Sequence, residues 1–227
     1  MTVALLVLLP ALGSASVLGL RRRPHGVGAA AVGAAVATLA IAVVAAWAEP
    51  GLAWRWSDTL ELRVAVDGFA RVMVVLIPVV AAPVLAYAAA TVAEGRTRLL
   101  ALLLGFVAAM ELLVVASDLL TLLLAWELIG AFSWALIGHG WRERSNGAAA
   151  AQAFITTRIG DLGLYVAAGM TFAATGGLGY DDLVAVDGAR QDALAAGLLL
   201  AVAAKSAQLP FSPWLFSAMA GPTPVSA

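Results

Sequence analysis

The stretch Leu99–Gly138, LLALLLGFVAAMELLVVASDLLTLLLAWELIGAFSWALIG, has only three charged residues in 40 positions: Glu111, Asp118 and Glu127. As a single α-helix it would be about 60 Å long, roughly twice the 30 Å hydrocarbon thickness of a bilayer. We therefore expect it to fold as two membrane-spanning helices. Ser117-Asp118 is the natural turn between them, with Asp118 as the N-cap of the second helix.

Apolar runs of similar length lie on both sides of this stretch. Of the 227 residues, 63% are hydrophobic and 12% are charged, whereas soluble domains have about 25% charged residues. This composition excludes a water-soluble globule and predicts an all-α, polytopic transmembrane helix bundle of about seven spans. Outside the opening stretch, the expected spans are Val3–Leu20, Gly26–Trp47, Phe69–Thr91, Ala148–Ala174 and a seventh that begins near Ala193 and breaks at Pro210 and Pro213.

The charge balance and the residue types exclude several kinds of chemistry. A net charge of −1 gives nucleic-acid binding no electrostatic basis. Without cysteine the chain has no thiolate metal site, iron–sulfur ligand or thiol nucleophile. Two histidines, His25 and His139, are too few and too far apart to predict a metal cluster. Any chemistry must therefore use carboxylates, lysine, arginine and water.

The loops give an orientation. Residues 49–67 are polar and contain a period-two alternation from Leu60 to Val64, which predicts a short extended hairpin on the outer surface. With the N-terminus outside, only Arg55, Arg63 and Arg190 lie in outer loops, and Asp181, Asp182, Asp187 and Asp192 form an acidic outer loop. The basic residues of the inner loops are then Arg21, Arg22, Arg23, Arg96, Arg98, Arg142 and Arg144. This excess of positive charge inside supports the predicted topology.

Charged residues inside the predicted spans need an explanation, because each costs at least about 2.5–3.5 kcal/mol to insert. Arg158 and Asp161 share one face of the sixth span, where they either neutralise each other or take part in transport. Glu127 and Lys205 have no partner within their own helices, so they need each other, water or a relay. The role of Glu111 stays open.

A glutamate and a lysine inside a membrane can act together as a proton switch. Desolvation favours the neutral form of a buried lysine, and a nearby carboxylate opposes this effect. If the carboxylate moves away or is protonated, the lysine releases its proton into a water chain. The predicted helix break at Pro210 and Pro213 fits this reading, since broken membrane helices often mark ion sites.

Several motifs resemble one known family. In chain order they are Asp67-Gly68, Asp118-Leu119-Leu120, Trp126-Glu127, Ser145–Ala150, Ala153–Asp161, Lys205–Pro210, Trp214-Leu215 and Ala218–Ala227. They resemble the antiporter-like subunits of respiratory complex I, above all the subunit L type, and the related subunits of Mrp-type cation/proton antiporters. The order and spacing match over about half of the chain.

The resemblance implies roles for particular residues. Glu127 corresponds to the membrane glutamate of helix 5 and Lys205 to the lysine of the broken helix 7, a pair that gates proton movement. Arg158 and Asp161 correspond to the helix 6 motif of the same network. NADH, FMN, iron–sulfur clusters and quinone are expected in partner subunits, with no cofactor and no redox catalysis in this chain. The expected location is the bacterial inner membrane.

Family members are longer than this chain, so we expect it to be the first part of an inverted-repeat fold, ending before helix 8. Residues 1–97 would form helices 1–3, and residues 98–227 the start of the proton-translocating domain. The resemblance favours a proton-translocating subunit of NADH:quinone oxidoreductase, partnered by the other membrane subunits. A subunit of a Mrp-type Na⁺/H⁺ antiporter or related complex is the alternative, and a non-transporting membrane scaffold is another.

Overall fold

The computed structural model describes residues 1–22, 24–57, 60–219 and 221–226. The predicted inner-loop position of Arg23, two residues of the predicted outer loop, and Ala220 and Ala227 of the C-terminal motif lie outside the described residues, as does the side chain of His25. The chain forms two compact units, which are described separately. Unit 1 comprises residues 1–52, 64–116 and 222–227, and unit 2 comprises residues 53–63 and 117–221.

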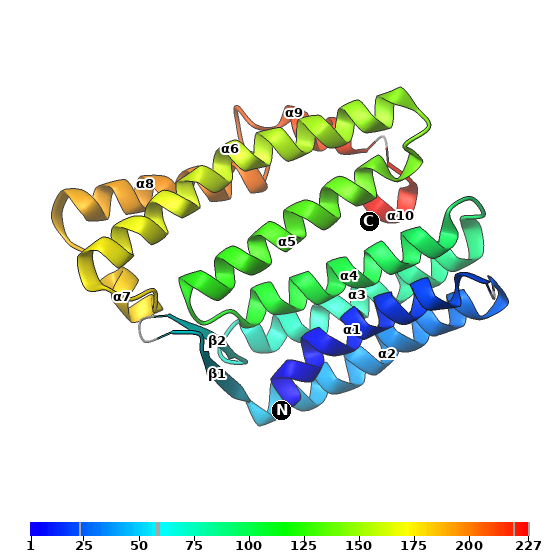
Figure 1. Cartoon of the computed structure of the whole chain (residues 1–227), viewed down its shortest axis with the longest axis horizontal. Coiled ribbons are helices and arrows are strands. Elements are labelled where there is room, and N and C mark those ends of the chain that lie inside the picture. The colour runs from blue at the N-terminus through cyan, green and yellow to red at the C-terminus, as the bar shows by residue number, and fades with distance from the viewer. Residues whose placement is uncertain (23, 58–59, 220, 227) are drawn as a thin grey trace. The chain divides into compact units, whose positions relative to one another are not determined.

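Unit 1 is built from long apolar helices that run alongside one another (Figure 1). They are α1 (Thr2–Gly19), α2 (Pro24–Ala48), α3 (Ala70–Thr91) and α4 (Arg96–Val115), with a short 3-10 turn after α1 (Leu20–Arg22). α1 packs against α2 and α4, and α3 packs against the same two helices. A Cβ at Gly13 would lie 2.7 Å from the Cβ of Ala34, so small residues let α1 and α2 approach closely.

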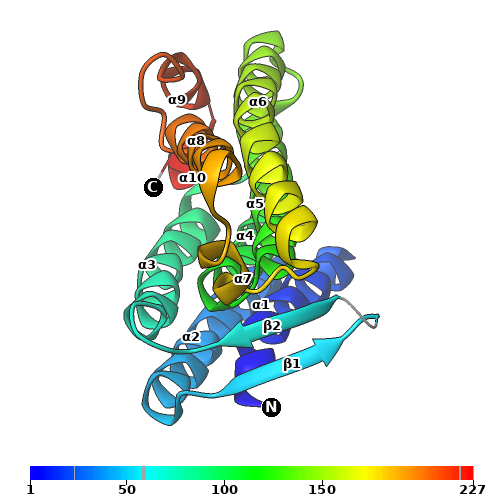
Figure 2. The ribbon, with the colours of Figure 1, turned by 90° about the vertical axis from the view of Figure 1, so that its left-hand side faces the viewer.

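A two-stranded sheet lies between α2 and α3 in the chain (Figure 2). Its strands are β1 (Gly51–Arg55) and β2 (Glu61–Ala65), which confirms the predicted extended hairpin. The Glu61 carboxylate accepts a 2.8 Å hydrogen bond from Nε of Arg63 and lies 3.4 Å from Nε of Arg55. The hydrogen bond from Arg63 is the main cause that holds the pKa of Glu61 below its ordinary value.

Unit 2 is centred on a long helix, α6, which packs against its other main helices (Figure 1). Its helices are α5 (Leu119–Ile137), a 3-10 turn (Gly138–Gly140), α6 (Arg144–Thr175), α7 (Tyr180–Val184), α8 (Gly188–Lys205) and α9 (Pro213–Ala218). A Cβ at Gly163 would overlap the backbone of Gly197, so α6 and α8 are in backbone contact. The last short helix, α10 (Thr223–Ser226), belongs to unit 1 and contacts α3.

The predicted turn at Ser117-Asp118 is confirmed. Asp118 is the N-cap of α5, and its Oδ1 accepts a 2.8 Å hydrogen bond from the backbone N–H of Thr121. Its Oδ2 accepts hydrogen bonds from the Thr121 hydroxyl at 2.7 Å and from the backbone N–H of Arg63 at 2.5 Å. The capping carboxylate therefore also ties β2 to the start of α5.

The predicted acidic loop is wrong in part. Asp181 and Asp182 lie in the first turn of α7, and Asp187 is the N-cap of α8, which begins at Gly188 rather than near Ala193. The first turn of α8 is polar and exposed, so apolar periodicity could not reveal it. At its other end α8 stops at Lys205, and helix resumes as α9 at Pro213. The predicted break in the seventh helix, around Pro210 and Pro213, is confirmed.

Five helical segments of the described chain are long and apolar enough to cross a membrane. They are Thr2–Arg22, Gly26–Ala48, Ala70–Thr91, Arg96–Val115 and Leu119–Gly140. They match the first five predicted spans, whereas the assignment of α6 and α8 as the sixth and seventh spans stays a prediction. The compact units divide at residues 116/117, one helix later than the predicted functional division at 97/98, which also stays a prediction.

Candidate functional site

The four ionisable residues predicted to carry transport all lie in unit 2. Glu127 is on α5, Arg158 and Asp161 are on α6, and Lys205 is the last residue of α8. We call these four residues the charged cluster. It contains two acids and two bases, so its formal charges balance.

Glu127 is held from α6 on two sides. Its Oε2 forms an ion pair with Nη1 of Arg158, and its Oε1 accepts a 2.8 Å hydrogen bond from the hydroxyl of Tyr165. The side chains of Glu127 and Arg158 are 25% and 30% exposed, so the ion pair is only partly desolvated. The guanidinium of Arg158 also lies over the ring of Phe154, at 4.8 Å from its centroid.

Asp161 is the most deeply buried member of the cluster, with 2% of its side chain exposed. Its Oδ1 accepts a 2.5 Å hydrogen bond from the indole N–H of Trp126. Its Oδ2 lies 3.8 Å from Nη1 of Arg158 and has no hydrogen-bond partner among the described residues. Arg158 therefore lies within reach of both carboxylates of the cluster.

Lys205 ends α8 where the chain leaves the helix. Its Nζ is buried and has no hydrogen-bond partner among the described residues, and it lies 5.2 Å from the ring centroid of Trp126. Beside it, the indole N–H of Trp214 on α9 donates a 2.8 Å hydrogen bond to the carbonyl of Ala204. The same carbonyl accepts a 3.2 Å hydrogen bond from the backbone N–H of Ala207, so the turn after α8 is held by both contacts.

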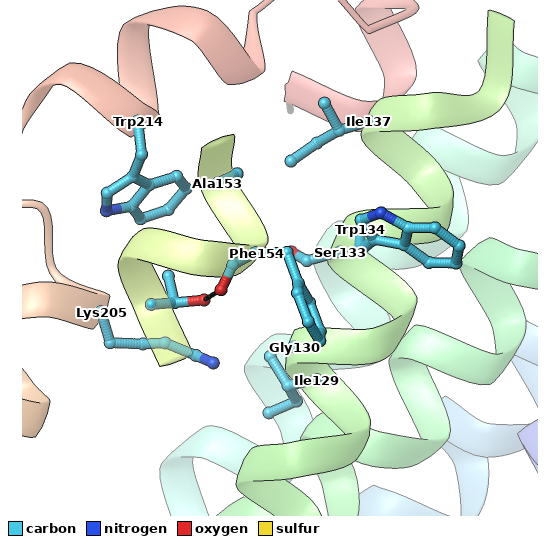
Figure 3. Close-up of a pocket in the computed structure, with 10 residues that line it drawn as sticks. Ile129, Gly130, Ser133, Trp134, Ile137, Ala153, Phe154, Lys205 and Trp214 are labelled. Carbon is cyan, nitrogen blue, oxygen red and sulfur yellow. Dashed lines mark hydrogen bonds between the residues drawn. The ribbon is translucent and has the colours of Figure 1, made fainter. Parts of the chain in front are cut away.

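A cavity of about 180 Å³ adjoins Lys205 (Figure 3). Aromatic and aliphatic side chains form most of its wall, and the hydroxyls of Ser133 and Thr157 are polar groups in the wall. The lining residues are Ile129, Gly130, Ser133, Trp134, Ile137, Ala153, Phe154, Thr157, Lys205 and Trp214. Such a volume has room for several water molecules.

The structure brings all four predicted residues together but changes one pairing. Among the described residues, Glu127 pairs with Arg158, and Lys205 makes no ion pair with it. A direct Glu127–Lys205 contact is therefore not what this structure contains. The predicted contact between Arg158 and Asp161 is present at 3.8 Å, but Arg158 is shared with Glu127.

The two further candidates, Glu111 and Asp118, lie outside the charged cluster. Glu111 belongs to unit 1, is fully buried on α4, and neither carboxylate oxygen has a hydrogen-bond partner among the described residues. The hydrogen bonds of Asp118 are those of a helix cap, as predicted. Pro210 lies in the interruption between α8 and α9, and Pro213 is the first residue of α9.

Sequence reasoning missed the neutral partners of the cluster. The sequence motif contains Trp126 but assigns it no partner, and no motif includes Tyr165. A signal was present for Tyr165, which follows Asp161 by four positions on α6 and so lies on the same helix face. Across the described ranges, no three His, Cys, Asp or Glu side chains come together as metal ligands would.

The charged cluster lies in the part of the chain that matches a known protein family. The family model described as "NADH:quinone oxidoreductase/Mrp antiporter, TM" matches residues 116–227, a range that contains the whole charged cluster. NADH-quinone oxidoreductase subunit L of Escherichia coli K12 is 43% identical over 141 residues, which is 59% of this chain and 23% of the relative. Subunit L of Mycobacterium tuberculosis is 37% identical over 98% of this chain and 38% of the relative.

The fold is also found in solved structures. A chain of the Mrp complex from Dietzia sp. DQ12-45-1b superposes with a TM-score of 0.88 at 26% identity, covering 100% of this chain and 26% of that one. A chain of an archaeal membrane-bound sulfane sulfur reductase superposes with a TM-score of 0.81 at 19% identity, over 99% of this chain and 49% of that one. The latter likeness concerns the fold alone. The chain thus spans less than half the length of these relatives.

Proposed function

Because this chain belongs to the family of antiporter-like membrane subunits that NADH:quinone oxidoreductases and Mrp antiporters share, we propose that its charged cluster moves protons. The main support for the proposal is that two buried polar atoms of the cluster, Nζ of Lys205 and Oδ2 of Asp161, lack a hydrogen-bond partner among the described residues. Buried polar groups are normally satisfied, and buried titratable groups that lie beside charged partners and a cavity are candidates for functional sites.

The proton-carrying atoms follow from this arrangement. Lys205 would hold a proton at Nζ and release it to water in the adjoining cavity. Asp161 would take up a proton at Oδ2, because Oδ1 is occupied by the indole N–H of Trp126. Arg158 remains charged throughout, so it would act only as a movable counter-charge.

Arg158 would set the balance between the two carboxylates. In its ion pair with Glu127 it neutralises that carboxylate, while Asp161 lies 3.8 Å away. A shift of the guanidinium toward Asp161 would break the ion pair with Glu127 and neutralise Asp161 instead. Asp161 would then stabilise the ammonium of Lys205 less, so proton release would be favoured. The cluster would thus have two states between which transport could alternate.

We further propose that the parent assembly is a bacterial inner-membrane NADH:quinone oxidoreductase and that the N-terminus faces outward. NADH, FMN, iron–sulfur clusters and quinone would belong to partner subunits, since this chain has no cysteine to hold a cluster. The M. tuberculosis subunit L match over 98% of the chain supports this assembly. A Mrp-type antiporter is the second candidate, supported by the TM-score of 0.88 with the Dietzia complex.

Purification from native membranes in mild detergent would separate the two assemblies. Co-purification with flavin and iron–sulfur subunits is the expected result. Co-purification with cation-antiporter subunits instead would move the assignment to the Mrp type.

The transport role itself is tested by Glu127→Gln. This change removes the charge that pairs with Arg158 and keeps the side-chain size. We expect the complex to assemble while protons pumped per NADH oxidised fall below the wild-type value. Glu143→Gln, the same substitution at an exposed residue, is the control and should pump normally. Normal pumping with poor assembly in Glu127→Gln would instead favour a structural scaffold.

A further inference from the structure

Trp126 contacts two members of the charged cluster through two different parts of its side chain. Its indole N–H donates a 2.5 Å hydrogen bond to Oδ1 of Asp161. Its ring lies 5.2 Å, measured from the centroid, from Nζ of Lys205. Asp161 is on α6 and Lys205 is on α8, so one side chain of α5 links the charged groups of two other helices.

Both contacts favour the charged forms of the groups involved. An indole N–H can only donate, and a donor aimed at a carboxylate stabilises the ionised form of that carboxylate. The face of an indole ring attracts a cation, and tryptophan does so more strongly than tyrosine or phenylalanine. Among the described residues, Nζ of Lys205 has no hydrogen-bond acceptor, so the ring face is its direct polar contact.

We propose that Trp126 is a positioning residue that couples Asp161 to Lys205. It holds Oδ1 of Asp161, leaving Oδ2 as the oxygen that can accept a proton, and it holds the ammonium of Lys205 beside that carboxylate. Arg158 of α6 also faces Lys205. Glu127 of α5 forms an ion pair with Arg158. This inference rests on the proposed function, since it assigns Trp126 a role within the same cluster.

The amine of Lys205 offers a direct readout, because Lys205 is the only lysine among these 227 residues. Amine acylation reports the neutral form of lysine only. We would label native membranes with acetic anhydride at a fixed pH and measure the labelling rate of the peptide that contains Lys205 by mass spectrometry. The measurement needs no transport, so it can fail or succeed independently of the proposed function.

Trp126→Phe keeps an aromatic ring but removes the N–H and weakens the ring's attraction for a cation. Without its donor, the ionised form of Asp161 is less favoured. A neutral Asp161 no longer stabilises the ammonium of Lys205, so the lysine gives up its proton more readily. We expect Lys205 to be labelled about tenfold faster than in the wild type, the size of effect that loss of a hydrogen bond to a charged group produces. The matched control for cavity access is Trp134→Phe, the same change on the same helix in the cavity wall, which should speed labelling far less than Trp126→Phe does.

A double-variant cycle distinguishes coupling from loosened packing. Asp161→Asn keeps an oxygen that accepts the indole N–H but removes the charge, so it should also speed labelling. In that background Trp126→Phe should add no more than about a twofold further change, since only the weaker attraction of the phenylalanine ring for the ammonium then matters. If Trp126→Phe fails to accumulate in membranes, Asp161→Asn alone carries the test, and unchanged labelling in that variant overturns the proposal.

Three results would overturn the inference. Labelling of Lys205 in Trp126→Phe could equal that of the wild type, which would show that the indole does not hold the lysine's proton. Labelling in Trp134→Phe could rise equally, which would show that cavity access alone controls the rate. Finally, the full effect of Trp126→Phe could persist in the Asp161→Asn background, which would show that the two residues act independently.

Discussion

Gly130 lies where both cations of the charged cluster approach α5. A Cβ built at this position would lie 3.4 Å from Nζ of Lys205 and 3.7 Å from Nη2 of Arg158. A methyl group there would fit without a severe clash, but it would contact both cations and partly desolvate them.

Gly130→Ala is expected to leave assembly intact and to slow proton transfer. Alanine favours helix by up to about 1 kcal/mol over glycine, so stability should not fall. Partial desolvation of the two cations on the order of 1 kcal/mol would slow transfer about fivefold. Proton uptake by inverted vesicles would measure this rate, with Gly169→Ala on α6 as the control. Wild-type uptake in Gly130→Ala would mean that desolvation of the two cations beside Gly130 does not limit proton transfer.

Asp118 makes its contribution through structure. Asp118→Ala removes the acceptor for the backbone N–H of Thr121 and for that of Arg63, and should destabilise the protein by about 1–3 kcal/mol. Asp118→Asn keeps one oxygen and should retain much of the stability, because asparagine is also a good N-cap. Thermal unfolding in detergent would compare the three proteins. Equal stability of Asp118→Ala and the wild type would contradict the assigned role.

For single residues, contacts within a few positions of the chain could be predicted from the sequence, whereas contacts between helices could not. The cap at Asp118 depends on a few consecutive residues, so the sequence alone was enough to predict it. The partner of Glu127 depends on how α6 is rotated and placed against α5. That placement brings Arg158 and Tyr165 to Glu127, and no sequence spacing between helices encodes it.

The packing of α6 against α8 requires glycine at particular positions. A Cβ at Gly163 would overlap the backbone of Gly197, whereas a Cβ at Gly169 on the same helix would meet nothing within 4 Å. A second overlap would occur between Gly160 and Ala204. Because Ala204 precedes Lys205, this seam also places the end of α8 at the charged cluster.

The same substitution at two positions of α6 should have opposite effects. Gly163→Ala is expected to destabilise unit 2 by about 1–3 kcal/mol, because the two backbones must separate. Gly169→Ala should stabilise the protein by up to about 1 kcal/mol through helix propensity alone. Thermal unfolding of both variants in detergent measures the difference. If Gly163→Ala proved as stable as Gly169→Ala, the close α6–α8 contact would be refuted.

The elements that sequence predicted well are those whose apolar runs extend to both ends. This holds for α1 to α5, whose limits lie within a few residues of the predicted ones. It fails at the start of α8, where the exposed polar turn after Asp187 is helical although it carries no apolar pattern. The helix break after Lys205 was predictable from Pro210 and Pro213, because proline has no backbone N–H and disfavours a helix interior.

The whole molecule places its proposed chemistry in one unit. The charged cluster, the cavity and the broken helix all belong to unit 2, and the family match begins at residue 116, where α4 ends. α4 groups with α1–α3 rather than with α5. Its apolar window is 61% buried, compared with 22–33% for the other candidate spans, so it is the most buried of these five helices. Hydropathy does not distinguish a central span from a peripheral one, so this grouping could not be predicted from sequence.

The proposed transport requires that Lys205 releases and rebinds a proton. The most direct test is proton pumping per NADH oxidised in sealed inverted vesicles from cells carrying Lys205→Met or Lys205→Arg, with assembly checked in the same membranes. Methionine removes the titratable group, and arginine keeps the positive charge but does not give up its proton. Both variants are expected to assemble and to pump fewer protons per NADH than the wild type. Wild-type pumping by an assembled Lys205→Met complex would contradict it.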